Sequence, residues 1–226
     1  MKEPFGLYLI LTNPVAGYEA CAQAAVDSGV RYLQLRMKNA KPEALLTTAR
    51  ALRSITRGSS TRLIINDHLS VAIESDADGI HLGQDDLSLS EARARWNIPE
   101  KIFGLSTHSL EQAIQSVELL PDYIGVGPVF STPTKANAGP ALGIEEVARI
   151  ARAVTIPSVA IGGINADNLP TLLDAGIGNF CVVRAVNEAA DPAVAIRNLQ
   201  GIWQEAQKKW ADTTTPSGAR ISHCTA

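Results

Sequence analysis

The sequence is poor in aromatic residues and has no excess of positive charge, and each shortage excludes a class of protein. Aromatic residues make up 5% of the 226 residues and the formal net charge is -3. We therefore expect neither a base-stacking surface nor the basic footprint of a nucleic-acid-binding protein. No apolar run approaches the roughly 20 residues that cross a bilayer, and the N-terminus lacks the basic-then-apolar pattern of a signal peptide. These absences predict a cytoplasmic protein that binds no membrane.

Cysteine is also scarce, which argues against a disulfide framework or a thiolate metal site. The three cysteines, Cys21, Cys181 and Cys224, are far apart and have no metal-ligand spacing. Cys21 and Cys181 lie in apolar patterns, where a free cysteine usually serves as a small buried residue. With 46% hydrophobic and 19% charged residues, the chain has ample material for a globular core.

What the chain does have is a regular alternation of short apolar runs with segments of helical composition. The runs lack a clean polar alternation, which is typical of strands covered on both faces in a parallel sheet. The eight expected strands are Leu7–Leu11, Tyr32–Leu35, Leu63–Ile65, Gly79–Leu82, Ile102–Leu105, Tyr123–Val126, Ser158–Ile161 and Phe180–Val183. The expected helices are Glu19–Ser28, Pro42–Arg57, Val71–Ser75, Ser88–Trp96, Leu110–Leu120, Ile144–Ala153, Ala166–Ala175 and Pro192–Trp210.

Eight strand–helix units in about this length of chain predict an α/β fold, a single (β/α)8 TIM barrel of parallel strands over residues 1–210. A capping box at Ser88 and Glu91, and glycines after the helices at Gly29 and Gly176, support this register. The alternative is an open, doubly wound sheet, but no Gly-x-Gly-x-x-Gly turn follows the first strand. We expect residues 211–226 to form a disordered tail.

Most polar interruptions fall at the ends of the expected strands, where barrel enzymes carry their active sites. Gln34, Arg36 and Lys38 alternate at the end of the second strand, so their side chains share a face that a diphosphate could contact. The alternative is a solvated strand edge.

Carboxylates follow the next two strands and suggest a metal site. Asn66-Asp67 closes the third strand, and Asp85-Asp86 follows the fourth. Two carboxylates from adjacent strands can hold one Mg2+, which takes its remaining ligands from water and substrate phosphates. Helix capping is the alternative for both positions, and the pattern does not choose between Asp85 and Asp86.

The later strands end in hydroxyl-rich and glycine-rich segments. Ser106 ends the fifth strand and is expected to hydrogen-bond substrate, whereas the role of His108 stays open because no orienting acid is evident. The long connection after the sixth strand contains Thr132, Thr134 and Lys135, which suit a cover over phosphate. Gly162-Gly163 follows the seventh strand, where barrels often bind a phosphate through backbone N–H groups.

Taken together, these motifs resemble the thiamine phosphate synthase family. The resemblance spans roughly residues 7–199 and rests on motifs in the family's order. They are Gln-Leu-Arg-x-Lys from Gln34, Ile-Asn-Asp ending at Asp67, His-Leu-Gly-Gln-x-Asp ending at Asp86, Gly-x-Ser-x-His from Gly104, Gly-Pro-x-Phe-x-Thr-x-Thr-Lys ending at Lys135, and Ile-Gly-Gly-Ile from Ile161.

The resemblance implies an enzyme that joins hydroxymethylpyrimidine diphosphate to thiazole phosphate and releases diphosphate with Mg2+. It assigns the pyrimidine diphosphate to Gln34, Arg36, Lys38, Asn66 and Lys135, with Ser106 on the pyrimidine side. It assigns Mg2+ to Asp67 and Asp86, and so favours Asp86 over Asp85. It assigns the thiazole phosphate to Thr132, Thr134 and Gly163.

One position departs from the family pattern. Many members have a small serine near the end of the eighth strand, where this chain has Arg184. Arg184 either supplies a cation to the thiazole phosphate or narrows its pocket.

Two alternatives to the synthase are a thiazole tautomerase-like isomerase and a non-catalytic barrel that binds thiamine phosphate. Retention of the charged residues argues against both, and a homo-oligomer is possible.

Overall fold

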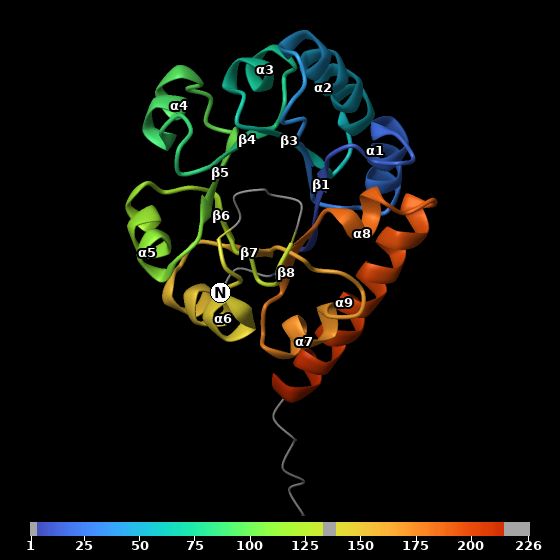
Figure 1. Ribbon diagram of the computed structural model, residues 1–226, viewed down its shortest axis with the longest axis vertical. Helices are drawn as coiled ribbons and strands as arrows, with labels where there is room; N and C mark the ends of the chain where they lie inside the picture. The colour runs from blue at the N-terminus through green and yellow to red at the C-terminus, as the bar shows by residue number, and fades with distance from the viewer. Residues whose placement is uncertain (1–3, 133–138, 215–226) are drawn as a thin grey trace, which may run out of the picture.

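The computed structural model describes residues 4–132 and 139–214, and its strands form one closed parallel barrel in the order β1-β2-β3-β4-β5-β6-β7-β8. Figure 1 shows the helices as a ring around these strands. Strand β1 pairs with β8 through the register Gly6↔Asn179, which closes the barrel. The predicted (β/α)8 fold is confirmed.

The strands lie close to their expected positions. Their bounds are β1 Gly6–Leu11, β2 Tyr32–Leu35, β3 Arg62–Asn66, β4 Gly79–Leu82, β5 Ile102–Thr107, β6 Tyr123–Val126, β7 Ser158–Ile161 and β8 Asn179–Val182. The helices are α1 Tyr18–Asp27, α2 Pro42–Thr56, α3 Leu69–Glu74, α4 Leu89–Arg95, α5 Leu110–Glu118, α6 Gly143–Ala153, α7 Leu169–Asp174, α8 Arg184–Asn187 and α9 Pro192–Thr214.

The expected helix-end signals are confirmed. Ser88 caps α4, since its hydroxyl accepts from the Glu91 backbone N–H at 3.3 Å and donates to the Glu91 carboxylate at 2.6 Å. Gly29 and Gly176 follow α1 and α7 with φ of 66° and 82°. Such left-handed conformations suit glycine because it has no Cβ.

Two details at the C-terminal end differ from the expectations. The short helix α8 follows β8 directly, so Arg184 begins a helix instead of ending a strand. Helix α9 continues to Thr214, past the expected end of the domain at residue 210. The rest of the expected tail lies outside the described residues. Among the described residues, no helix is long and apolar enough to cross a membrane.

The barrel buries two separate apolar layers, which explains why its strands read as unbroken hydrophobic runs. On β1, Leu7, Leu9 and Leu11 belong to the large core between sheet and helices. The alternate residues Tyr8 and Ile10 face the barrel interior. Because successive side chains of a strand point to opposite faces, both sets are buried.

Polar side chains secure the amino-terminal rim of the barrel. The Asp78 carboxylate accepts from the Leu63 backbone N–H at 2.8 Å, and the Asp122 carboxylate accepts from that of Phe103 at 2.8 Å. The Asn179 side-chain oxygen accepts from the Phe5 N–H at 2.7 Å. Asp78 and Asp122 immediately precede β4 and β6, and each tethers the preceding strand in the chain. Asn179 begins β8 and tethers the start of β1 through Phe5 and Gly6.

Candidate active site

The expected site residues follow the carboxyl ends of different strands, so the closed barrel gathers their backbones at one mouth. Asn66 ends β3 and Ser106 is the last-but-one residue of β5. Gly163 follows β7, and Arg184 follows β8. Thr134 and Lys135 lie outside the described residues, so their roles stay predictions.

Asp67 and Asp86 come together at this mouth although different strands supply them. Burial, together with the Asp86 carboxyl group within hydrogen-bonding reach, raises the pKa of Asp67 to about 6. The Arg36 guanidinium and a hydrogen bond from Asn66 oppose this rise. Two carboxylates that repel each other at neutral pH form a site with an affinity for a cation.

Helix capping does not account for either aspartate. Residue His68, and not Asp67, is the N-cap of α3, and Ser88 is the N-cap of α4. The Asp86 carboxylate instead accepts from the Gly83 backbone N–H at 2.7 Å, which fixes its loop. Asp67 has a φ of 61°, an uncommon conformation for a residue with a side chain. Backbone strain of this kind gathers at functional sites.

The three polar residues of the β2 motif lie at different depths. Gln34 is 2% exposed and points into the barrel, where its amide contacts Tyr8. Arg36 follows the strand, is half-buried and is close enough to Asp67 to lower the pKa of that carboxyl group. Lys38 is exposed in the following turn. The motif therefore reaches from the interior to the solvent.

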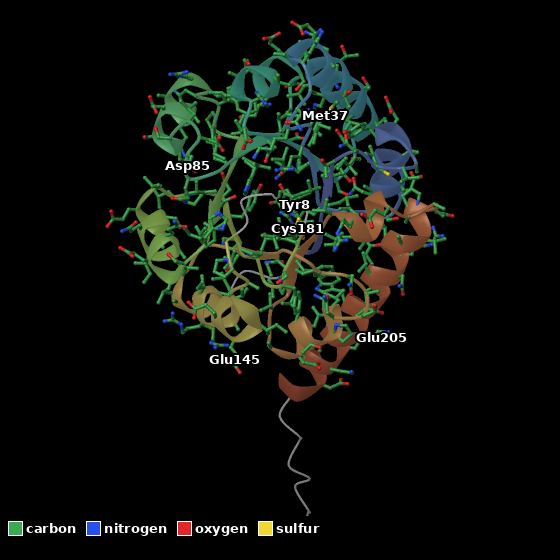
Figure 2. The ribbon with its side chains drawn as sticks, viewed as in Figure 1. Tyr8, Met37, Asp85, Glu145, Cys181 and Glu205 are labelled. Atoms are coloured by element: carbon green, nitrogen blue, oxygen red, sulfur yellow. The ribbon has the colours of Figure 1, made fainter. Side chains whose placement is uncertain are left out.

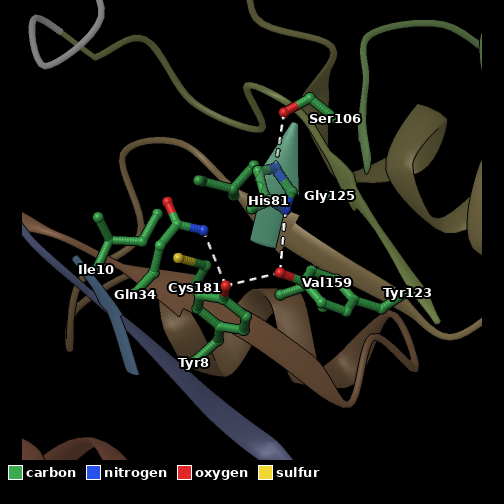
Figure 3. A pocket seen from close by; sticks show the side chains of 10 residues that line it. Tyr8, Ile10, Gln34, His81, Ser106, Tyr123, Gly125, Val159 and Cys181 are labelled. Atoms are coloured by element: carbon green, nitrogen blue, oxygen red, sulfur yellow. Dashed lines mark hydrogen bonds between the residues drawn. The ribbon is translucent and has the colours of Figure 1, made fainter. Parts of the chain in front are cut away.

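Beneath the mouth lies a pocket of about 280 Å3, a volume that includes its opening to solvent. A chain of hydrogen bonds crosses it, as Figure 3 shows. The Ser106 hydroxyl lies 2.9 Å from His81 Nε2, and His81 Nδ1 lies 3.0 Å from the Tyr123 hydroxyl. That hydroxyl lies 2.7 Å from the Tyr8 hydroxyl, which accepts from Gln34 Nε2 at 2.8 Å.

Gly104 makes room for this chain. A Cβ at this β5 position would collide with the Tyr123 ring and approach His81 Nδ1 to 2.6 Å. The tyrosine ring therefore crosses the space that a side chain on β5 would fill. Figure 2 shows Tyr8 and Cys181 near the barrel axis, in contrast to Asp85 and Glu145 at the periphery.

Tyr8 and Tyr123 are pocket residues that the sequence interpretation missed, and His81 is a third, which it recognised only as part of the His-Leu-Gly-Gln-x-Asp motif. Each occupies an inward position of its strand, and each is the polar or aromatic exception in a short aliphatic run. That exception was the available signal. His108, whose role stayed open, is not part of this series of hydrogen bonds. Its Nδ1 lies 2.7 Å from the Gly127 carbonyl oxygen.

The glycine-rich turn after β7 packs directly against the segment after β6. The Phe130 N–H donates to the Gly162 carbonyl at 3.0 Å. Gly163 has a φ of 68°, and a Cβ there would lie 2.7 Å from the Phe130 Cβ. Only glycine fits this close approach. Thr132 is half-buried on the same segment as Phe130, which brings it toward the β7 turn.

The donors at the mouth are compatible with a hard divalent cation. No group of three or more His, Cys, Asp or Glu side chains that could hold a metal is found in residues 4–132 and 139–214. The Asp67–Asp86 pair nevertheless fits Mg2+, which is usually bound through one or two carboxylates together with water and substrate phosphates. Mg2+ itself stays a proposal.

The fold and the site define a (β/α)8-barrel enzyme whose polar groups converge on the carboxyl end of the barrel. A sequence model described as "Thiamine monophosphate synthase" matches residues 7–186. The chain therefore belongs to the thiamine monophosphate synthase family, as the sequence motifs predicted.

Individual relatives agree with this assignment. A thiamine-phosphate synthase from Syntrophomonas wolfei is 44% identical over 90% of this chain and 99% of its own length. One from Chloroflexus aurantiacus is 40% identical over 85% of this chain and 88% of its own length. A solved structure, thiamine phosphate pyrophosphorylase from Pyrococcus furiosus, is 33% identical with a TM-score of 0.80, over 89% of this chain and 96% of that one.

Proposed function

We propose that this protein condenses 4-amino-2-methyl-5-hydroxymethylpyrimidine diphosphate with 4-methyl-5-(2-phosphoethyl)thiazole to give thiamine phosphate and diphosphate. The family match over residues 7–186 supports this reaction. The observation that carries the site assignment is the approach of Asp67 and Asp86 beside Arg36 at the carboxyl mouth. These charges suit a substrate that carries a diphosphate.

The reaction replaces one bond at the exocyclic carbon of the pyrimidine. The C–O bond to the diphosphate breaks, and its electron pair leaves with the diphosphate. The lone pair of the thiazole nitrogen then forms the new C–N bond. The amino-substituted ring delocalises the positive charge that develops on the carbon, so no protein nucleophile is needed. Catalysis then consists of positioning and charge stabilisation.

The residues at the mouth serve the departing diphosphate. Arg36, Lys38 and Lys135 would neutralise its developing negative charge, and Asn66 would hydrogen-bond it. Asp67 and Asp86 would hold Mg2+, which when bound supplies further positive charge to the phosphate oxygens. Gln34 and Ser106 would hold the pyrimidine in the pocket below, since both line it.

The second substrate would bind on the opposite side of the mouth. Gly163, with Thr132 and Thr134, would receive the thiazole phosphate through backbone and hydroxyl hydrogen bonds. Arg184 would add a cation where many relatives of this type have serine. The cytoplasmic location and a homo-oligomer expected from the sequence remain proposals, and the reaction needs no nucleic acid or membrane.

A direct assay tests this proposal. Purified protein mixed with both phosphorylated precursors and Mg2+ should form thiamine phosphate and diphosphate in equal amounts, and a chelator should stop the reaction. Failure to form either product would refute the synthase function. Rearrangement of the thiazole phosphate alone would instead indicate an isomerase, and binding of thiamine phosphate without turnover would indicate a sensor.

Adjacent aspartates provide a matched control for the metal site. Asp67→Ala and Asp86→Ala should each lower turnover by roughly a hundredfold or more, because each removes a ligand of the cation that stabilises the leaving group. Asp85→Ala should stay within about twofold of the parent, since Asp85 is exposed at the periphery. Equal losses for Asp85→Ala and Asp86→Ala would contradict the assignment.

A further inference from the structure

Counting the hydrogens on each side chain shows which group donates and which accepts in every hydrogen bond that crosses the pocket. The two tyrosines in this series of hydrogen bonds, Tyr8 and Tyr123, are each 2% exposed. Burial raises the pKa of each phenol well above its usual value. Both therefore stay protonated, and each has one hydrogen to donate.

The direction starts at Gln34. Its amide nitrogen can only donate, and it donates to the Tyr8 hydroxyl at 2.8 Å. Within the described part of the chain, the other partner of that hydroxyl is Tyr123, at 2.7 Å. The Tyr8 hydrogen is buried and needs an acceptor, so it points to the Tyr123 oxygen.

The same argument continues to the histidine. Since the Tyr123 oxygen already accepts from Tyr8, its own hydrogen is directed to His81 Nδ1, 3.0 Å away. His81 Nδ1 then acts as an acceptor, which places the ring proton of a neutral imidazole on Nε2. A proton on Nδ1 as well would leave Tyr8 or Tyr123 with a buried hydrogen and no acceptor.

His81 Nε2–H in turn points to the Ser106 hydroxyl oxygen at 2.9 Å. An oxygen that accepts this bond has its own hydrogen available for a different partner. We propose that every hydrogen bond along Gln34, Tyr8, Tyr123 and His81 is donated in the same direction, toward Ser106. This series of bonds, called the relay below, fixes the His81 tautomer and presents Ser106 to the substrate as a hydrogen-bond donor. Tyr8, Tyr123 and His81 act on Ser106 as positioning residues, and Gln34, which also lines the pocket, sets the direction of the bonds.

The relay predicts which atom of the ligand Ser106 contacts. A hydroxyl whose hydrogen points outward selects an acceptor such as an unprotonated ring nitrogen and disfavours an amino group at the same place. The identity of that ligand as an aminopyrimidine depends on the proposed function. The tautomer of His81 does not, because it is a property of the free protein.

Nitrogen NMR of the full-length protein tests the relay without substrate. With 15N-labelled histidine, the four histidines are distinguished by a His81→Asn variant. His81 should show an unprotonated Nδ1 and a protonated Nε2 near neutral pH. A protonated Nδ1 would overturn the proposal, because it would mean that the bonds run from Ser106 toward Gln34.

Changes at the two ends of the chain should have unequal effects. Gln34→Leu removes the donor that sets the direction, so the ratio of the Nε2–H to the Nδ1–H form should fall several-fold. Tyr123→Phe should have the same effect and keeps the test open if Gln34→Leu does not fold. Ser106→Ala should leave the ratio unchanged, although it weakens substrate binding. A shift in Ser106→Ala with none in Gln34→Leu would also refute the relay.

If the assay shows no synthase activity but the histidine signals behave as described, only the proposed function fails. If thiamine phosphate forms but His81 has the opposite tautomer, only the relay fails. Within an active enzyme, Tyr123→Phe, which changes no residue assigned to substrate contact, should raise KM for the pyrimidine substrate more than it raises KM for the thiazole phosphate. A purely structural loss would lower kcat without that difference.

Discussion

The carboxylates at the two ends of the barrel have opposite electrostatic surroundings. At the amino-terminal rim, Asp76 and Asp78 lie among cations, with Arg53 3.2 Å from Asp78 and Lys101 3.3 Å from Asp76. At the carboxyl mouth, Asp67 faces a second carboxylate and has a raised pKa. The negative charges at the rim are balanced by cations of the protein itself. At the mouth, a bound cation or ligand would have to offset the repulsion between the two carboxylates.

The pKa values show the same contrast. Desolvation acts to raise the pKa of Asp76, but the hydrogen bond and charge of Lys101, with the charges of Arg53 and Arg57, outweigh it and lower the pKa. For Asp67, burial and Asp86 outweigh Arg36. The rim therefore contributes to stability at neutral pH, and the mouth reduces it. Such a cost is typical of functional sites.

The largest effect on stability is expected at the rim. Asp78→Ala removes the acceptor of the Leu63 N–H and the partner of Arg53, and the side chain of Asp78 is only 11% exposed. The free energy of unfolding should fall by about 3 kcal/mol, because a largely buried cation and an N–H lose their partner. Denaturant titration measures this loss.

The activity of the folded Asp78→Ala protein provides the control. Turnover per folded molecule, assayed well below the melting temperature, should stay close to that of the parent. If Asp78→Ala abolished turnover while leaving the unfolding free energy intact, the division of roles between rim and mouth would be wrong.

A smaller effect of opposite sign is expected at the mouth. Asp67→Asn removes one of two facing carboxylates, so without divalent ions it should raise the unfolding free energy. The gain should be about 1 kcal/mol at most, because both side chains retain solvent contact. Turnover should be lost in the same variant, which separates stability from activity.

The sign of its pH dependence follows from the raised pKa. Between about 3.8 and 6 the folded protein holds a proton on Asp67 that the unfolded chain has released. The parent therefore loses stability as pH rises through this window. The melting-temperature difference between Asp67→Asn and the parent, measured with a chelator, should grow from near zero below pH 4 to its maximum above pH 6. A difference independent of pH would rule out this cause.

The sequence predicted the barrel well because burial on both faces gives each strand an apolar run that local pattern can detect. Charged residues at the mouth were also visible, since Arg36 and Asp67 interrupt such runs. Tyr8 and Tyr123 were missed because a buried tyrosine in a strand resembles any core aromatic residue until its hydroxyl has a partner. The partners lie on other strands, and only the closed barrel brings them together.

The same limit applied to Arg184. Its neighbours Val183 and Ala185 continue an apolar pattern, so the end of β8 and the start of the one-turn helix α8 could not be separated by composition. The bonds that define α8 include one from the Glu188 backbone N–H to the Arg184 carbonyl at 3.0 Å. A helix this short leaves little periodicity to read.

The smallest effect tests whether every ion pair at the rim matters. Arg57 lies 3.4 Å from Asp76, but their side chains are 68% and 60% exposed. Arg57→Ala should therefore change the unfolding free energy by less than about 0.5 kcal/mol, since solvent and salt screen exposed pairs. Denaturant titration beside Asp78→Ala makes the comparison. A loss for Arg57→Ala as large as that for Asp78→Ala would mean that net charge at the rim, and not burial of a tethering carboxylate, stabilises this end of the barrel.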